Sequence, residues 1–137
     1  MSTVNDHLVL IVGKSAAGKS ASLMKMPDPG GVFYANCEAG KRLPFKAGFE
    51  QHTITDPLQM YEVFNRAETK PKTHTIVIDS LTYLLDMYET NYIVDSANGM
   101  KAWGDFAQFF KRLMQQYVAL STKRVIFTAH TLDTLNE

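Results

Sequence analysis

The 137-residue sequence has a single cysteine, Cys37, so an internal disulfide bond is excluded. One cysteine is typical of a reducing compartment, and we expect Cys37 to be a small buried hydrophobic residue. No apolar run approaches the roughly 18 residues that span a membrane. The N-terminus lacks the basic and apolar regions of a secretory signal. We therefore expect a cytoplasmic protein without a membrane partner.

The sequence also lacks an excess of either charge. Lys and Arg total 14, and Asp and Glu total 14, so no overall basic field favours nucleic acid, and any such contact must come from local patches. Low-complexity segments and internal repeats are absent. Because 45% of the residues are hydrophobic and 20% are charged, we assign residues 1–137 to one globular domain with one core.

The most informative stretch is Gly13-Lys14-Ser15-Ala16-Ala17-Gly18-Lys19-Ser20, which matches the P-loop pattern G-x-x-x-x-G-K-[ST]. An apolar run precedes it and a segment that can be helical follows it, as a phosphate-binding loop requires. Backbone N–H groups from Gly13 to Lys19 would surround the phosphates. Lys19 would reach the β- and γ-phosphates, and the Ser20 hydroxyl would bind Mg²⁺. The expected cofactors are ATP and Mg²⁺.

Strands and helices are expected to alternate along the rest of the chain. Strand-length segments occur at residues 7–12, 32–37, 51–54, 75–79 and 124–129. The nearly continuous apolar character of residues 7–12 predicts a central strand that is buried on both faces. The alternation predicts an α/β three-layer sandwich with a mostly parallel sheet, covered by helices on both faces.

Helical signals separate the later strands. Asp56 is a suitable cap and Pro57 a suitable first residue for a helix that ends near Pro71. Its apolar residues fall on one face and are Met60, Val63, Phe64 and Ala67. Further helices are expected at residues 81–92 and 101–121. Trp103 shares the apolar stripe of the last helix, which favours core packing over base stacking.

Three polar residues follow apolar strands, where ligands bind in open α/β sheets. Asp79 ends the strand at residues 75–79 and would hold Mg²⁺ through a bound water. Glu38 would orient or deprotonate an attacking water. His130 would sense or stabilise the γ-phosphate. The structural alternatives are a helix cap for Asp79, an exposed loop acid for Glu38 and a core-edge histidine for His130.

The segments at residues 33–38, 75–80 and 124–130 follow the P-loop in the order and spacing of the RecA-like core of P-loop NTPases, which this chain resembles. The resemblance implies that Glu38 is the catalytic glutamate, that Asp79 closes the Walker B strand and that His130 senses nucleotide. With Trp103, His130 is similar to small RecA-like nucleotide-binding proteins of bacteriophages, including Sak-type single-strand annealing proteins. The resemblance therefore implies a homo-oligomeric ATPase that acts on single-stranded DNA in recombination or annealing, in the host cytoplasm.

Two departures limit the resemblance. RecA-like recombinases have an N-terminal segment that packs on a neighbouring subunit, whereas only about six residues precede the first strand here. The family core also continues with more strands and a second DNA-binding loop. We therefore expect a core that lacks its C-terminal strands, either a fragment or a minimal version. Residues 124–129 would then form an exposed edge strand that a partner chain covers.

Alternative functions remain open. A nucleoside or nucleotide kinase would need arginines beside the phosphates, for which Arg42 and Arg66 are poor candidates. A nucleotide-gated DNA-binding module would bind ATP with negligible turnover. Lys14 occupies the place where MinD/ParA-type ATPases carry a lysine that enters the partner's site, although those proteins prefer Gly where this chain has Ser15. By resemblance, DNA would contact residues 95–101 and the segment after His130.

Overall fold

The structure is a computed structural model that describes residues 8–13, 23, 25–38 and 47–130. Most of the predicted phosphate-binding residues lie outside these ranges, namely Lys14, Ser15, Ala16, Ala17, Gly18, Lys19 and Ser20. Arg42 and the segment after His130 also lie outside them. The remaining predicted site residues are described and are Gly13, Glu38, Asp79 and His130.

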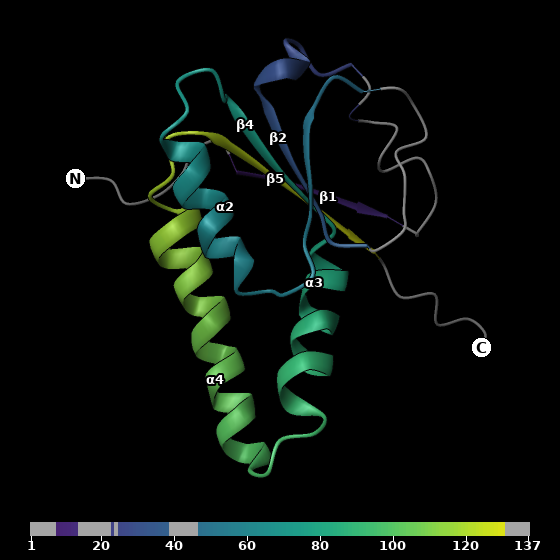
Figure 1. The fold of residues 1–137 in the computed structure, drawn as a ribbon, viewed down its shortest axis with the longest axis vertical. Coiled ribbons are helices and arrows are strands. Elements are labelled where there is room, and N and C mark those ends of the chain that lie inside the picture. The colour runs from purple at the N-terminus through teal and green to yellow at the C-terminus, as the bar shows by residue number, and fades with distance from the viewer. Residues whose placement is uncertain (1–7, 14–22, 24, 39–46, 131–137) are drawn as a thin grey trace.

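The described residues form a five-stranded sheet in which every pairing is parallel (Figure 1). The strands are β1 (Leu8–Gly13), β2 (Val32–Asn36), β3 (Glu50–Thr53), β4 (Thr75–Asp79) and β5 (Arg124–His130). Their spatial order is β1-β5-β4-β2-β3. Because all strands run in the same direction, their carboxyl ends lie along one edge of the sheet. The predicted parallel α/β fold is confirmed.

The described helices cover one face of the sheet (Figure 1). They are α2 (Gln59–Glu68), α3 (Leu81–Tyr88) and α4 (Gly99–Arg112), and a short 3₁₀ turn at Pro29–Gly31 precedes β2. Helices α3 and α4 continue as π-helical turns at Glu89–Ile93 and Leu113–Val118. Within the described ranges, no helix combines the length and the apolar character needed to cross a membrane.

Alternate residues of each central strand belong to two different cores. Phe33, Ile76 and Phe127 pack toward the helices. Tyr34 and Val77 pack on the opposite face, in a cluster that also contains Val32, Ile126, Leu23 and Phe49. This division follows from the strand geometry, in which successive side chains point to opposite faces. It also determines which side of the sheet each polar residue occupies.

The prediction of a central, fully buried first strand is wrong. β1 lies at the edge of the described sheet, and its side chains at Leu8, Val9, Leu10 and Val12 are 39–56% exposed. The cause is the insertion of β5 between β1 and β4, which leaves β1 one neighbour among the described strands. For the same reason, the expectation that residues 124–129 form an exposed edge is wrong.

Helix α2 confirms the predicted apolar face and much of the predicted start. Its stripe of Met60, Val63, Phe64 and Ala67 is buried. The helix begins at Gln59 rather than Pro57. Even so, Asp56 Oδ1 accepts a hydrogen bond from the Leu58 N–H at 2.9 Å, and Gln59 Oε1 accepts one from the Asp56 N–H at 3.1 Å. These reciprocal contacts satisfy backbone donors that the helix leaves unpaired.

Helix α4 differs from its predicted stripe at Trp103. The indole is 48% exposed and meets the Phe106 ring edge-on, with 5.6 Å between the ring centroids. Ala102 and Phe109 are the buried residues of this helix. Phe106 and Phe110, three and seven residues after Trp103, are partly buried against the helix-facing core, so the helical periodicity holds along the helix and fails at its start. Core packing of Trp103, as favoured from the sequence, is therefore wrong.

Candidate functional site

The four described site residues all lie at the carboxyl edge of the sheet. Gly13, the first residue of the P-loop motif, pairs in register with His130 at the end of β5. Asp79 ends β4 and pairs with Asn36 at the end of β2. Glu38 follows Asn36 by two residues. The strand order therefore brings together residues that are up to 117 positions apart in the chain.

Glu38 and His130 contact each other directly. His130 Nε2 lies 3.2 Å from Glu38 Oε2, and the two side chains are only 11% and 14% exposed, respectively. A carboxylate oxygen accepts hydrogen bonds, so this contact is a hydrogen bond in the tautomer that carries its hydrogen on Nε2. The Glu38 N–H donates to Asn36 Oδ1 at 2.9 Å, which fixes the backbone that carries the carboxylate. The exposed loop acid suggested as an alternative for Glu38 is thus not what the structure shows.

The start of helix α3 supports the histidine. The His130 N–H donates a hydrogen bond to Thr82 Oγ1 at 2.9 Å. The Tyr83 ring meets the imidazole edge-on, with centroids 5.1 Å apart and an interplanar angle of 80°. Sequence reasoning missed both residues. Their place directly after the Asp79-Ser80 strand end is the signal that could have identified them.

Asp79 is completely buried and accepts hydrogen bonds on both carboxylate oxygens. Tyr34 Oη donates to Oδ2 at 2.5 Å, and Thr128 Oγ1 donates to Oδ1 at 2.7 Å. From the sequence, Tyr34 and Thr128 were assigned to strands but not to the site. They are polar residues within apolar strands, two positions before Asn36 and His130, and that spacing places them on the face of the sheet that carries Asp79.

The described part of the site brings the carboxyl groups of Asp79 and Glu38 close to Tyr34 and Cys37. Burial is the largest cause that raises the pKa of Tyr34, followed by its hydrogen bond to Asp79, so the hydroxyl remains a donor at neutral pH. Burial, then the charges of Asp79 and Glu38, raises the pKa of Cys37 to about 12. Cys37 is 3% exposed, which confirms the expected small buried hydrophobic residue. A cation bound at this edge would offset the carboxylate charge.

The donor set fits a magnesium ion that shares its coordination with phosphate. Among the described residues, no group of three His, Cys, Asp or Glu side chains could hold a metal by itself. Mg²⁺ typically keeps several waters and takes one or two protein oxygens together with substrate phosphates. Both Asp79 oxygens accept hydrogen bonds from uncharged hydroxyl groups, and a carboxylate is the type of oxygen ligand that Mg²⁺ sites use. When bound, Mg²⁺ would neutralise charge on the phosphates.

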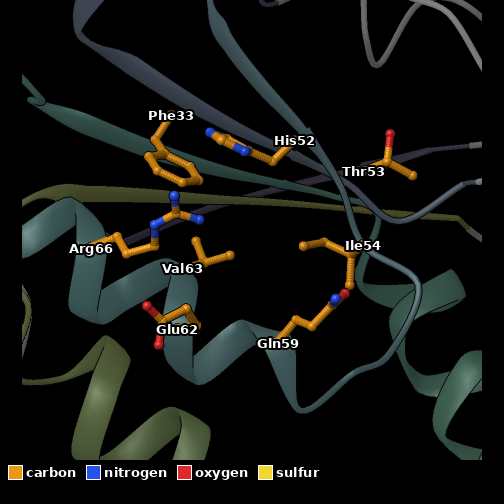
Figure 2. A pocket seen from close by; sticks show the side chains of 8 residues that line it. All are labelled: Phe33, His52, Thr53, Ile54, Gln59, Glu62, Val63 and Arg66. Carbon is orange, nitrogen blue, oxygen red and sulfur yellow. The ribbon is translucent and has the colours of Figure 1, made fainter.

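A separate cavity of about 140 Å³ lies elsewhere in the fold (Figure 2). It is lined by residues of β2, β3 and α2 and of the segment between the last two, namely Phe33, His52, Thr53, Ile54, Gln59, Glu62, Val63 and Arg66. Phe33 and Val63 belong to the helix-facing core, on the side of the sheet opposite Tyr34 and Val77. Ligand pockets usually measure about 300–1,000 Å³, so this cavity is too small for a nucleotide.

A comparison with protein families finds a match that includes every residue of this site. A family model described as an AAA domain matches residues 6–137, which include the P-loop motif and each described site residue. No curated protein matches the sequence. The shared region spans nearly the complete chain and agrees with the parallel sheet and its strand-end site. On this basis the chain belongs to the AAA domain family and is a nucleotide-binding P-loop NTPase.

Proposed function

We propose that this protein is a RecA-like ATPase of bacteriophage type that acts in annealing or recombination of single-stranded DNA. The observation that carries the hydrolytic part is the contact between Glu38 and His130, 3.2 Å apart, at the sheet edge that also holds Asp79 and Gly13. A carboxylate oriented by a histidine beside a phosphate-binding loop suits activation of water. The proposed cellular location is the host cytoplasm.

In the proposed mechanism, the backbone from Gly13 to Lys19 binds the ATP phosphates, and the Lys19 ammonium contacts the β- and γ-phosphates. Ser20 and Asp79 would hold Mg²⁺, Asp79 through water. Glu38 accepts a proton from the attacking water, whose oxygen bonds to the γ-phosphorus while ADP leaves with the bridging oxygen. His130 fixes the Glu38 carboxylate and reports on the γ-phosphate.

The position of Arg66 favours hydrolysis over the kinase alternative. A kinase would need cationic side chains that clamp the transferred phosphoryl group. Figure 2 shows Arg66 reaching from α2 toward Phe33, in the cavity on the helix-covered side. Asp79 hydrogen-bonds to Tyr34, whose ring packs in the opposite core. Arg66 is therefore not a phosphoryl clamp, and Arg42 lies outside the described residues.

Exposed side chains near the start of α4 support the proposed contact with single-stranded DNA. Met100 is 87% exposed and Trp103 is 48% exposed. Sequence-independent binding of single strands uses aromatic side chains on which bases stack, together with cationic groups. Lys101 lies between these two residues and pairs with Asp105 at 2.9 Å. The α3–α4 pair extends away from the sheet (Figure 1), which leaves this end accessible. A homo-oligomer is proposed on the resemblance alone.

A turnover assay on full-length variants tests the proposal. We expect Mg²⁺-dependent ATP hydrolysis that single-stranded DNA stimulates, and a fall in kcat of about 10²–10⁴-fold in Glu38→Gln, because a general base contributes about that factor. Glu62→Gln is the matched control, since Glu62 is an exposed acid on α2. Lys19→Ala should remove nucleotide binding, which equilibrium titration with a fluorescent ATP analogue would measure.

Other outcomes would select the alternatives. Tight ATP binding without turnover in any condition would support the nucleotide-gated module. Phosphate transfer that requires an added nucleoside would support the kinase. If Lys19→Ala binds nucleotide as tightly as the wild type, the P-loop assignment itself is wrong.

A further inference from the structure

The Asp79 carboxylate is held between hydroxyl groups from both neighbouring strands. β4 lies between β5 and β2, and each of those strands contributes one donor. Thr128 on β5 donates to Oδ1 at 2.7 Å, and Tyr34 on β2 donates to Oδ2 at 2.5 Å. All three residues are at most 1% exposed. Bulk water therefore does not compete for these two bonds.

The strand register explains why a long side chain is required to reach the Asp79 carboxylate from β2. Phe127 pairs with Ile78, so Thr128 lies beside Asp79 and a short side chain suffices. On the other side, Asn36 pairs with Asp79, whereas Tyr34 pairs with Val77 two residues earlier. Tyr34 must reach diagonally to the carboxylate, a distance that a long aromatic side chain can cover.

The Tyr34 ring is itself held in place. It is 1% exposed and packs in the core with Val32, Val77 and Ile126. Its centroid lies 5.9 Å from that of Phe49. A ring fixed on all sides leaves the hydroxyl little freedom, so the hydrogen bond fixes the orientation of the carboxylate in turn.

We propose that Tyr34 is a positioning residue for the metal carboxylate, because its hydrogen bond sets the orientation in which Asp79 would serve nucleotide-bound Mg²⁺. This inference rests on the proposed function, because it requires that Asp79 serves the metal. Thr128 has the same proposed role, because it hydrogen-bonds to the other carboxylate oxygen of Asp79. Removal of a residue that hydrogen-bonds to a metal ligand typically lowers metal affinity or activity by 10–100-fold.

A purely structural role is the competing explanation. A buried carboxylate needs hydrogen-bond partners whatever its function, and loss of one partner lowers stability. A structural role predicts that nucleotide affinity, if it changes, changes equally with and without Mg²⁺. A positioning role predicts that nucleotide affinity in EDTA stays the same, and that the increase in affinity caused by Mg²⁺ becomes smaller. The ratio of the two affinities therefore separates the explanations.

The experiment compares full-length wild type and Tyr34→Phe by titration with a fluorescent ATP analogue, in excess Mg²⁺ and in EDTA. We expect equal dissociation constants in EDTA and about tenfold weaker binding of the variant in Mg²⁺. Thr128→Val should behave in the same way. Tyr61→Phe is the matched control, because Tyr61 donates to the Phe109 carbonyl oxygen at 3.3 Å within the helix-facing core. Thermal unfolding checks that each variant is folded.

The possible failures are distinguishable. If the wild type binds more tightly with Mg²⁺ and Tyr34→Phe keeps the whole gain, the positioning role is wrong and the proposed function stands. Equal weakening in both conditions also overturns the positioning role. If the wild type itself gains nothing from Mg²⁺, the metal site of the proposed function fails, and this inference fails with it.

Discussion

At the scale of single residues, Cys37 shows how strongly the site alters its neighbours. Its backbone N–H donates to the Asp79 carbonyl oxygen at 2.7 Å, which extends the β2–β4 ladder beyond the end of β2. Its thiol is buried beside Asp79 and Glu38, and burial followed by these charges raises its pKa to about 12. The proximity that suits a cation site thus makes the thiol unreactive.

We expect native Cys37 to resist alkylation. Only the thiolate attacks iodoacetamide, and a pKa near 12 rather than about 8.5 reduces the thiolate on the order of 10³-fold at neutral pH. Intact-mass spectrometry of the native protein should show slow labelling, and the same protein in urea should label fully. Rapid labelling without denaturant would contradict the burial of the thiol.

At the scale of elements, β3 is tied to the end of α2 by a small charged cluster. Lys70 Nζ lies 2.5 Å from Glu50 Oε2, and His52 Nε2 lies 2.8 Å from the same oxygen. Lys70 also lies over the Phe33 ring, 5.4 Å from its centroid. The hydrogen bond from Lys70, and then that from His52, lowers the pKa of Glu50 below its usual value.

This cluster predicts a modest acid dependence of stability. A carboxyl group with a lower pKa in the folded state stabilises the fold above its unfolded pKa of about 4.3, and that contribution is lost as pH falls through the folded pKa. Between pH 6 and pH 3 we expect the unfolding free energy of Glu50→Gln to fall less than that of the wild type. The difference should be below about 1 kcal/mol, because solvent screens the Glu50–Lys70 pair. Urea titrations across this range measure it, and Glu62→Gln should match the wild type.

At the scale of the whole molecule, protection from solvent is uneven across the sheet. β4 is buried at every position and has strands on both sides. β1 has one neighbouring strand among the described residues and exposes Leu10 and Val12 by more than half. The phosphate-binding motif begins at the end of this less protected strand. Binding regions are often drawn from the less stable parts of a fold.

Hydrogen exchange should reveal this difference. We expect the amides of β1 to exchange faster than those of β4 in the nucleotide-free protein, because opening β1 disrupts few buried contacts. Peptide-resolved mass spectrometry measures both strands in one experiment. Equal protection of β1 and β4 would mean that another surface covers the edge in solution. Repeating the exchange at two protein concentrations would show whether that surface belongs to a second copy.

Much of the candidate site was predictable because its signals are local. Asp79, Glu38 and His130 each follow an apolar strand, and the carboxyl ends of parallel strands share an edge. The structure confirms their common position. Tyr34 and Thr128 were not identified, because their importance depends on which strands flank β4. The exposure of Trp103 was missed because helical spacing alone does not say at which residue along a helix the apolar face stops contacting the core.

The sequence by itself determined the P-loop pattern, the parallel α/β class and the strand-end residues, since each arises from neighbouring positions or a short period. Only the tertiary structure decided that β5 lies between β1 and β4, that β1 is an edge strand and that two hydroxyls hold Asp79. Alternation along a strand states which residues share a face but not which strand lies alongside. Strand neighbours are selected by long-range packing of the whole chain.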